Sequence, residues 1–407
     1  MRVEIKKGVA RGRVSVPPSK SAAHRHIICA ALACGQSLLH GVAFSEDILA
    51  TLDCIRALGA AVTVEGDCVT IEGIGGKSVA PQSLPTLPCR ESGSTLRFMI
   101  PIAMLSGGGV FRGTERLISR GIGIYEGLFE GSADIHKEKE QISVCGRLTS
   151  GKYTLAGNVS SQFISGLLFV LPTLEGDSTI EILPPFESRG YVDMTVDTLR
   201  RFGVEIEQKS ELCYLVRGSQ RYSPIETRIE GDWSQAAFFY GFGLLGGEVE
   251  VDGLDKASLQ GDRVCLEIYK NMSRGYTEAD LSGCPDLAPI LFAMASAAHG
   301  ARFTGTRRLA IKESNRAEVM AMELRKLGAE ITVLENEVVI SPSTLHKPSE
   351  SLLGHNDHRV VMALSVLSTR FGASIEGAEA IAKSYPAFFE DMRRLGLEII
   401  EYDGIGK

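Results

Sequence analysis

The segment VPPSKSAAHRHIICAAL, residues 16–32, decides the fold that the sequence predicts. Two prolines end the preceding strand, because proline lacks an N–H donor and fixes φ. Ser19 and Ser21 offer hydroxyls that can cap a helix, and the apolar run that follows predicts that this helix is buried. A helix N-terminus favours anions. Lys20 and Arg25 add cations at that end, so an anionic ligand would offset their repulsion. Two solvated cations beside an ordinary cap are the alternative interpretation.

Short polar stretches followed by an apolar helix recur along the chain. A helix that is apolar on all sides is buried, so each of these stretches predicts the start of a buried helix. The six stretches are SKSAAHR at 19, ESGSTLRFMI at 91, SSQFISGLL at 160, DWSQAAFFY at 232, PDLAPILFA at 285 and NDHRVVMAL at 356.

A second pattern alternates with the first, in which an amphipathic helix ends in an apolar residue and glycine and two strands follow. It occurs at 51–73, 195–218 and 319–341, in truncated form at 388–404, and more weakly at 125–146 and 265–283. Glycine suits the end of such a helix because the next residue often needs a positive φ. The expected pivots are Gly59, Gly131, Gly203, Gly275, Gly328 and Gly396.

Together the two patterns predict an α/β fold of six βαβαββ-type repeats, three in each of two lobes. The apolar helices would lie inside and the sheets and amphipathic helices outside, as in an inside-out α/β barrel. We expect residues 1–18 and 229–407 to form one discontinuous lobe and residues 19–228 the other. The buried helices would direct their N-termini into a cleft between the lobes, which would hold the active site.

The composition argues against several classes of protein. The chain has 407 residues, 44% hydrophobic and 23% charged, which is typical of a globular protein with two or three domains. A net charge of -7 argues against nucleic-acid binding. The sequence predicts neither a signal peptide nor a membrane helix. The nine cysteines lack metal-site spacing, so we expect reduced thiols, a cytoplasmic protein and no metal.

Cations gather at the predicted helix starts and the adjoining loops. An acidic protein with such a cluster is expected to bind small polyanions. Asp286 and Glu313 would then be an acid/base pair, although Asp286 could equally be a helix cap and Glu313 part of a solvated charged face. No Walker motif or GxGxxG context accompanies them. The cations are Lys20, Arg25, Arg97, Arg120, Arg316, Arg359 and Lys383.

Several further polar residues exceed what capping needs. Only one residue of the Ser160–Gln162 group is needed as a cap, and Asp357, His358 and Arg359 together precede another buried helix. Ser188 and Tyr191 are weaker candidates of the same kind. The glycine-rich stretch 107–123, which carries Arg116 and Arg120, is expected to be a functional loop.

In this order, the motifs resemble those of the 5-enolpyruvylshikimate-3-phosphate (EPSP) synthases, the enolpyruvyl transferases of the shikimate pathway. The resemblance spans essentially the whole chain. The family fold has two lobes of three repeats with inward helices, in agreement with the fold expected above. The resemblance implies a transferase of chorismate and aromatic amino-acid biosynthesis, and the target of glyphosate. The matching segments are PPSKSAAHR, SGSTLR, SSQFISGLL, PDLAP, IKESNR, NDHR and AKSYPAFF.

The resemblance also implies a reaction and a set of residues. The 5-hydroxyl of shikimate 3-phosphate adds to C2 of phosphoenolpyruvate while C3 is protonated, and the intermediate then loses phosphate. Asp286 would be the base on the hydroxyl, and Glu313 with Lys20 would handle the proton at C3. The implied phosphoenolpyruvate ligands are Lys20, Gly93, Arg120, Gln162, Arg316, Arg359 and Lys383. The implied shikimate 3-phosphate ligands are Lys20, Ser21, Arg25, Ser160, Ser161, Gln162, Ser188, Tyr191, Asp286 and Lys312.

No cofactor is implied, and we expect a monomer that binds only these small molecules. Three positions depart from the family pattern: Glu91 and Arg308 stand where asparagine is usual, and the loop after Arg120 lacks its usual proline.

Two rival interpretations remain. The first is a UDP-N-acetylglucosamine enolpyruvyl transferase, a family that shares the fold but is expected to carry a reactive cysteine in the corresponding loop. Residues 105–123 of this chain contain no cysteine. A non-catalytic protein that binds a phosphorylated ligand is the other, and the presence of both Asp286 and Glu313 argues against it.

Overall fold

The computed structural model describes residues 1–75 and 83–402. The chain divides into two compact units. Unit 1 is formed by Met1–Pro17 and the described part of Gly231–Lys407, and unit 2 by Pro18–Glu230. These divisions lie one and two residues from those expected at 18/19 and 228/229. The N-terminal segment therefore belongs with the second half of the sequence.

Within residues 18–75 and 83–230, three four-stranded sheets share one pattern. In each, the first two strands are parallel and the remaining neighbours are antiparallel. The first sheet has the order β14 (Glu226–Arg228), β3 (Gln36–His40), β5 (Cys68–Glu72) and β4 (Ala61–Glu65). The second has the order β6 (Thr86–Arg90), β7 (Gly108–Gly113), β9 (Gln141–Gly146) and β8 (Ala133–Lys137). The third has the order β10 (Lys152–Ala156), β11 (Ser178–Leu183), β13 (Cys213–Val216) and β12 (Ile206–Ser210).

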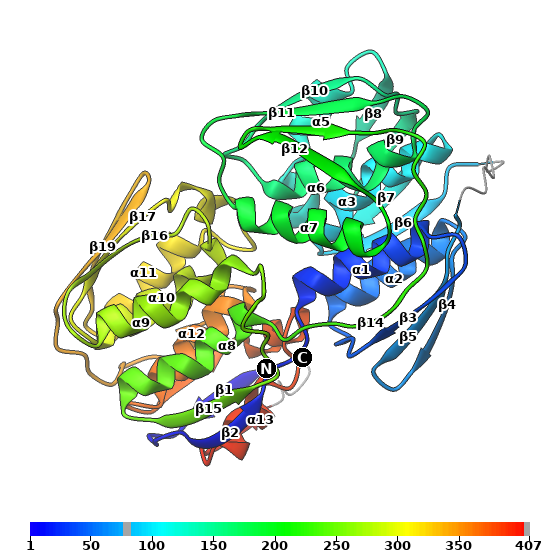
Figure 1. Cartoon of the computed structure of the whole chain (residues 1–407). Helices are drawn as coiled ribbons and strands as arrows, with labels where there is room; N and C mark the ends of the chain where they lie inside the picture. Colours follow the sequence, from blue (N-terminus) through cyan, green and yellow to red (C-terminus); the bar gives the residue numbers. More distant parts are fainter. Residues whose placement is uncertain (76–82, 403–407) are drawn as a thin grey trace. The chain divides into compact units, whose positions relative to one another are not determined.

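The helices of unit 2 lie between these sheets, with strands β8–β12 on one side and β3–β5 on the other (Figure 1). Almost every residue of the three apolar helices is buried, whereas the amphipathic helices bury one face. The apolar helices are α1 (Lys20–Leu32), α3 (Gly93–Ala103) and α6 (Ser161–Val170). The others are α2 (Glu46–Ala57), α4 (Glu115–Ser119), α5 (Gly123–Leu128) and α7 (Arg189–Arg201).

Unit 1 repeats the four-stranded pattern twice and adds a reduced third sheet. One sheet has the order β20 (Leu352–Leu353), β21 (Ala373–Glu376), β1 (Arg2–Ile5) and β22 (Ile399–Tyr402). Another has the order β16 (Thr277–Asp280), β17 (Ala301–Thr304), β19 (Glu337–Ser341) and β18 (Glu330–Leu334). Among the described residues, the third is the parallel pair β15 (Glu248–Asp252) and β2 (Arg11–Ser15).

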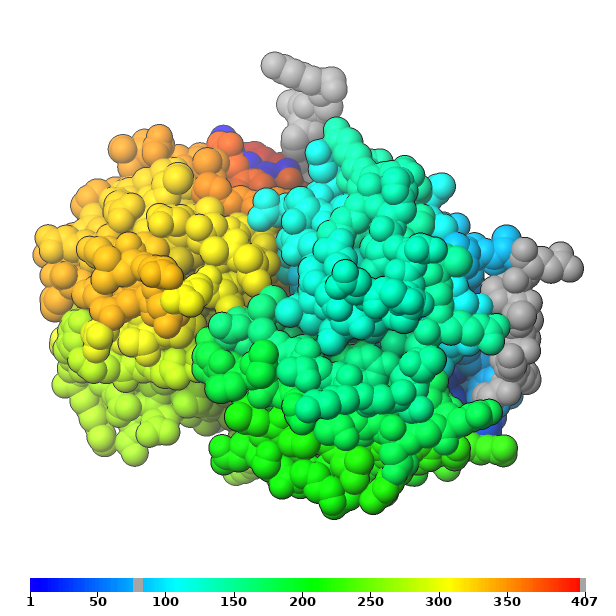
Figure 2. Space-filling model, turned by 90° about the horizontal axis from the view of Figure 1, so that it is seen from above, coloured from blue at the N-terminus to red at the C-terminus, as the bar shows by residue number. Residues whose placement is uncertain are grey.

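Three apolar helices form the interior of unit 1: α8 (Trp233–Gly241), α10 (Ala288–Ala297) and α12 (His358–Ser368). The amphipathic helices are α9 (Cys265–Met272), α11 (Arg316–Lys326) and α13 (Phe388–Arg394). In a space-filling view the segments coloured yellow to orange, which include β16–β19, lie at the surface of this unit (Figure 2). The two-lobed α/β fold with enclosed helices is thus confirmed.

The structure corrects three details of the repeats. The copy expected at 265–283 has no strand pair, because after α9 the single strand β16 joins the sheet of the next repeat. Gly275 accordingly lacks the positive φ that the other five pivot glycines adopt. The expected loop at 107–123 instead holds β7, α4 and the start of α5, since Thr114 caps α4 through Leu117 N at 3.2 Å.

Three absences concern the described residues. None of their helices has the length and apolar character needed to cross a membrane. The nine cysteines carry no disulfide, and no group of three or more histidine, cysteine, aspartate or glutamate side chains in residues 1–75 and 83–402 could hold a metal ion.

Candidate active site

The starts of α1, α2, α3 and α6 meet at one end of unit 2. Ser19 caps α1, and Lys20 Nζ lies 2.8 Å from Asp47 Oδ2 in the first turn of α2. The Asp47 carbonyl in turn accepts a hydrogen bond from Thr95 Oγ1 in α3, at 3.4 Å. This convergence is what the sequence predicted for the buried helices. Asp47 was missed, because nothing in its local sequence indicates a contact with a lysine 27 residues away.

Arg25 lies inside unit 2 and contacts neutral groups. It is 3% exposed, and its guanidinium donates to Thr195 Oγ1 at 2.8 Å, Ser21 O at 2.6 Å and Tyr191 O at 2.8 Å. No carboxylate among the described residues forms an ion pair with it. Burial therefore lowers its pKa to about 10. A buried cation of this kind is poorly compensated, and an anionic ligand would stabilise it.

Gln162 connects two of the helix starts. Its Oε1 accepts from Arg97 Nη1 at 2.6 Å, and its Nε2 donates to Ser94 Oγ at 2.8 Å. Ser160 is the cap of α6, with Oγ 3.3 Å from Gln162 N, and Ser161 is buried. The sequence predicted one cap within Ser160–Gln162 without saying which residue it is, and the structure gives Ser160. Ser94 was missed.

Arg120 lies against the start of α3. A Cβ placed on Gly93 would stand 3.1 Å from Arg120 Nη1 and 3.2 Å from Cζ, so the absence of a side chain lets the guanidinium approach the backbone. Ser188 precedes α7 with φ of 54°, and its side chain makes no capping bond. Tyr191 N donates to Ser188 O at 3.1 Å, so Ser188 lies beside Tyr191 at the start of α7.

A second cluster lies at the starts of α8, α10, α11 and α12 in unit 1, with Asp286 at its centre. Asp286 precedes α10 in the short helix η5 (Pro285–Leu287) and does not act as a simple cap. Its Oδ1 lies 3.3 Å from Lys312 Nζ and 2.9 Å from Arg316 Nη1, and its Oδ2 lies 3.1 Å from Arg359 Nη2. The capping interpretation of Asp286 is therefore wrong.

Arg316 is the buried cation of this cluster, 1% exposed. Besides Asp286 it contacts Glu313 Oε2 at 2.7 Å and Asp357 Oδ2 at 2.9 Å. Burial opposes its charge, but Asp357, Glu313 and Asp286 together raise the pKa of the guanidinium. Burial also acts to raise the pKa of the Asp357 carboxyl, but Arg316 outweighs it and the net pKa is lowered.

The remaining predicted cations join the same cluster. Arg359 Nη1 donates to Asp286 O at 3.1 Å, and Nη2 donates to Ser234 Oγ of α8 at 2.9 Å. Burial lowers the pKa of the Lys312 ammonium. Lys383, at the end of η7 (Ala378–Lys383), donates to Asn356 O at 2.7 Å. Glu313 is therefore an ion-paired carboxylate, and the solvated charged face was the wrong interpretation.

Comparison with known proteins identifies the family. The sequence profile of EPSP synthase (3-phosphoshikimate 1-carboxyvinyltransferase) matches residues 5–282 and 276–392. The chain belongs to the EPSP synthase family. It is 40% identical to the 3-phosphoshikimate 1-carboxyvinyltransferase of Clostridium kluyveri, over 100% of this chain and 99% of that protein. It is 38% identical to the enzyme of that name from Clostridium perfringens strain 13, over 97% and 98% of the two chains.

Solved structures agree with this placement. An EPSP synthase from Acinetobacter baumannii superposes with a TM-score of 0.78 and 25% identity, over 98% of this chain and 100% of that one. The enolpyruvyl transferase NikO from Streptomyces tendae gives a TM-score of 0.75 at 16% identity, which shows the shared fold alone. The EPSP synthase fold implied by the family resemblance is thereby confirmed.

Proposed function

We propose that this member of the EPSP synthase family transfers the enolpyruvyl group of phosphoenolpyruvate to the 5-hydroxyl of shikimate 3-phosphate and releases phosphate. The observation that carries the chemical assignment is the shared contact of Asp286 and Glu313 with Arg316, at 2.9 and 2.7 Å. Two carboxylates on one fixed cation can receive and deliver protons at different atoms of the substrates.

The first step needs a base and an acid. Asp286 removes the proton of the 5-hydroxyl as its oxygen bonds to C2 of phosphoenolpyruvate. Glu313, assisted by Lys20, delivers the proton that C3 gains in the same step. The tetrahedral intermediate then expels phosphate from C2 while C3 gives up a proton to Glu313, and the electron pair of that C–H bond restores the double bond.

Cations would stabilise the charges of the substrates and of the leaving phosphate. We assign phosphoenolpyruvate to Lys20, Gly93, Arg120, Gln162, Arg316, Arg359 and Lys383. We assign shikimate 3-phosphate to Lys20, Ser21, Arg25, Ser160, Ser161, Gln162, Ser188, Tyr191, Asp286 and Lys312. The buried Arg25, whose hydrogen bonds go only to neutral groups, supports an anionic ligand in unit 2.

In unit 1, Lys312, Arg316 and Arg359 are held by the carboxylates of Asp286, Glu313 and Asp357. These ion pairs fix the cations before substrate binds, which reduces the cost of ordering them later. We propose that both clusters act on one substrate pair. Substitutions in either unit should then change the kinetics of the same reaction.

A phosphate-release assay tests the proposal. The chain is incubated with phosphoenolpyruvate and either shikimate 3-phosphate or UDP-N-acetylglucosamine. We expect release only with shikimate 3-phosphate. Release with the UDP-sugar instead would assign the chain to the other enolpyruvyl transferase activity, and binding without release would indicate a non-catalytic protein.

A further inference from the structure

The segment that leads into α12 has an unusual backbone. His355 and Asn356, which are consecutive and not glycine, have φ values of 48° and 54°. A residue other than glycine in this region costs free energy and persists only where its surroundings hold it. The segment continues directly into Asp357, which contacts Arg316, and Arg359, which contacts Asp286. Whatever holds His355 and Asn356 therefore also sets the position of these two residues.

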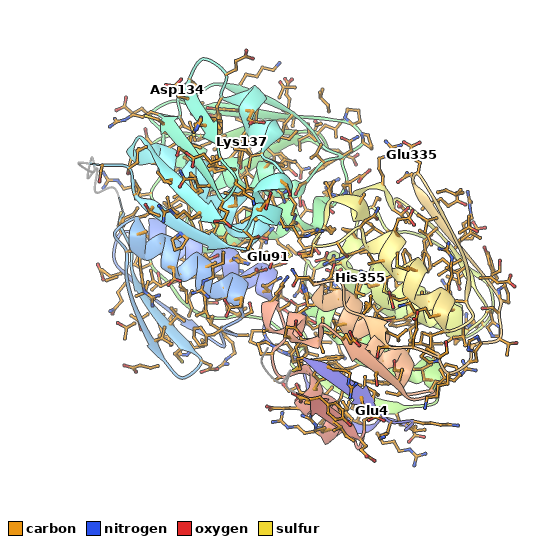
Figure 3. All side chains as sticks on the ribbon, turned by 180° about the vertical axis from the view of Figure 1, so that it is seen from behind. Glu4, Glu91, Asp134, Lys137, Glu335 and His355 are labelled. Atoms are coloured by element: carbon orange, nitrogen blue, oxygen red, sulfur yellow. The ribbon has the colours of Figure 1, made fainter. Side chains whose placement is uncertain are left out.

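Glu323 is the group that holds the start of this segment. It lies in α11 with a fully buried side chain. Its Oε2 accepts from Leu353 N at 2.9 Å, and its Oε1 lies 2.8 Å from His355 Nε2. Lys326 Nζ, also 2.9 Å from Oε2, balances its charge. Figure 3 labels His355 in this unit. One buried carboxylate thus binds the residues on both sides of Gly354.

The other end of the segment is attached to the same helix. Arg316 and Glu323 are seven residues apart in α11, which places them on one face. Arg316 binds Asp357 from that face, while Lys383 donates to Asn356 O. The segment is therefore held at both ends by α11, and its middle carries the attachment point of Lys383.

We propose that Glu323 is a positioning residue for the phosphoenolpyruvate-binding cations Arg359 and Lys383, which it sets through His355 and Asn356. The inference rests on the proposed function of those two cations. Glu323 touches neither of them in the structure and acts only through the segment 353–357. Its loss would let His355 and Asn356 leave the left-handed region, and both cations would lose their fixed places.

The test compares three variants in the full chain. Glu323→Ala removes both acceptors, and Glu323→Gln keeps one oxygen for Leu353 N. The matched control is Glu318→Gln, an exposed residue of the same helix. The measurements are KM for each substrate, and amide hydrogen exchange of the peptide that contains 353–359.

We expect Glu323→Ala to raise KM for phosphoenolpyruvate by about tenfold to a hundredfold, because small displacements of binding groups have effects of this size. KM for shikimate 3-phosphate should stay within about twofold, and Glu323→Gln should lie between alanine and wild type. The peptide should exchange faster in the alanine variant. The glutamine variant keeps the test valid if the alanine variant does not fold.

Unchanged exchange in both Glu323 variants would overturn the proposal. Equal changes in both KM values, or faster exchange with an unchanged KM for phosphoenolpyruvate, would overturn the positioning role. Wild-type protein that releases no phosphate would contradict the proposed function instead, and the exchange comparison would still decide whether Glu323 holds the segment.

Discussion

Asp286 and Glu313 bind different nitrogens of one guanidinium: Arg316 Nη1 lies 2.9 Å from Asp286 Oδ1, and Nη2 lies 2.7 Å from Glu313 Oε2. A third carboxylate also binds this guanidinium, because Asp357 Oδ2 lies 2.9 Å from Arg316 Nε. The separation of the two proposed proton-transfer groups is thus set by a rigid planar cation. A lysine would not reproduce this arrangement, because its ammonium lacks the planar fork.

Asp286→Asn should reduce phosphate release by a factor on the order of 10² to 10⁴, the usual contribution of a general base. Asparagine keeps an oxygen for Arg316, so the fold should persist, as measured by circular dichroism. Glu278→Gln, an exposed change in the neighbouring strand β16, is the control. Retention of more than about a tenth of the activity by Asp286→Asn would rule out its role as the base.

Arg359→Ala should raise KM for phosphoenolpyruvate more than KM for shikimate 3-phosphate, because Arg359 is assigned to phosphoenolpyruvate alone. We expect KM for phosphoenolpyruvate to rise by about tenfold to a hundredfold, which corresponds to the loss of a charge-assisted contact of roughly 1.5–3 kcal/mol. Steady-state kinetics with each substrate varied in turn measures it. Arg370→Ala, an exposed arginine beyond the end of α12, is the control. Equal changes for the two substrates would contradict the assignment.

Gly93→Ala should weaken phosphoenolpyruvate binding and leave shikimate 3-phosphate nearly unaffected. The new methyl group would stand 3.1–3.2 Å from three atoms of the Arg120 guanidinium, so Arg120 must shift by a few tenths of an ångström. Gly127→Ala is a matched control, since no atom lies within 4 Å of the added Cβ. If KM for phosphoenolpyruvate is the same in both variants, Arg120 and Gly93 do not form a joint binding surface.

His26 should make the fold less stable in acid. Burial lowers its pKa from 6.5 to about 4, although its hydrogen bond to Ala22 O acts in the opposite direction. As the pH falls from 6.5 towards 4, the unfolded chain binds a proton that the folded chain does not, so the free energy of unfolding falls. The difference in the pKa of His26 between the unfolded and folded states corresponds to a decrease of about 3 kcal/mol in the free energy of unfolding.

The measurement for His26 is urea unfolding at several pH values, for wild type and His26→Gln. Only the pH dependence is compared, because the substitution also removes the ring contact with Phe202. The variant should lose less stability between pH 6.5 and 4. Identical slopes for the two proteins would show that His26 titrates normally in the fold.

Local sequence patterns predicted much of the fold because they report on short-range physics. A cap such as Ser19 or Ser160, an all-apolar run and a pivot such as Gly59 each determine a helix boundary within a few residues. Five of the seven candidate cations lie in the first two turns of such helices, whereas Arg120 follows the end of α4 and Lys383 ends η7. The reduced repeat around Gly275 was missed, since a single strand that joins the next sheet has no local signature.

The partners of each site residue could not be predicted in the same way. The contacts of Asp286 with Lys312, Arg316 and Arg359 join residues 26 to 73 positions apart. The contacts of Asp47 with Lys20 and of Glu323 with His355 also join residues that are distant in the sequence. From residue type alone, Asp47 and Glu323 would be expected to be exposed charges. Such pairs depend on how helices pack in the folded unit, so they emerge only from the structure.

Identification of the product distinguishes enolpyruvyl transfer from hydrolysis of phosphoenolpyruvate. The chain is incubated with shikimate 3-phosphate and phosphoenolpyruvate labelled with ¹³C at C2 and C3, and the reaction is followed by ¹³C NMR. We expect an enolpyruvyl ether at the 5-oxygen, formed in equal amount with inorganic phosphate. Labelled pyruvate with phosphate, or no change in the label despite bound substrates, would contradict this expectation.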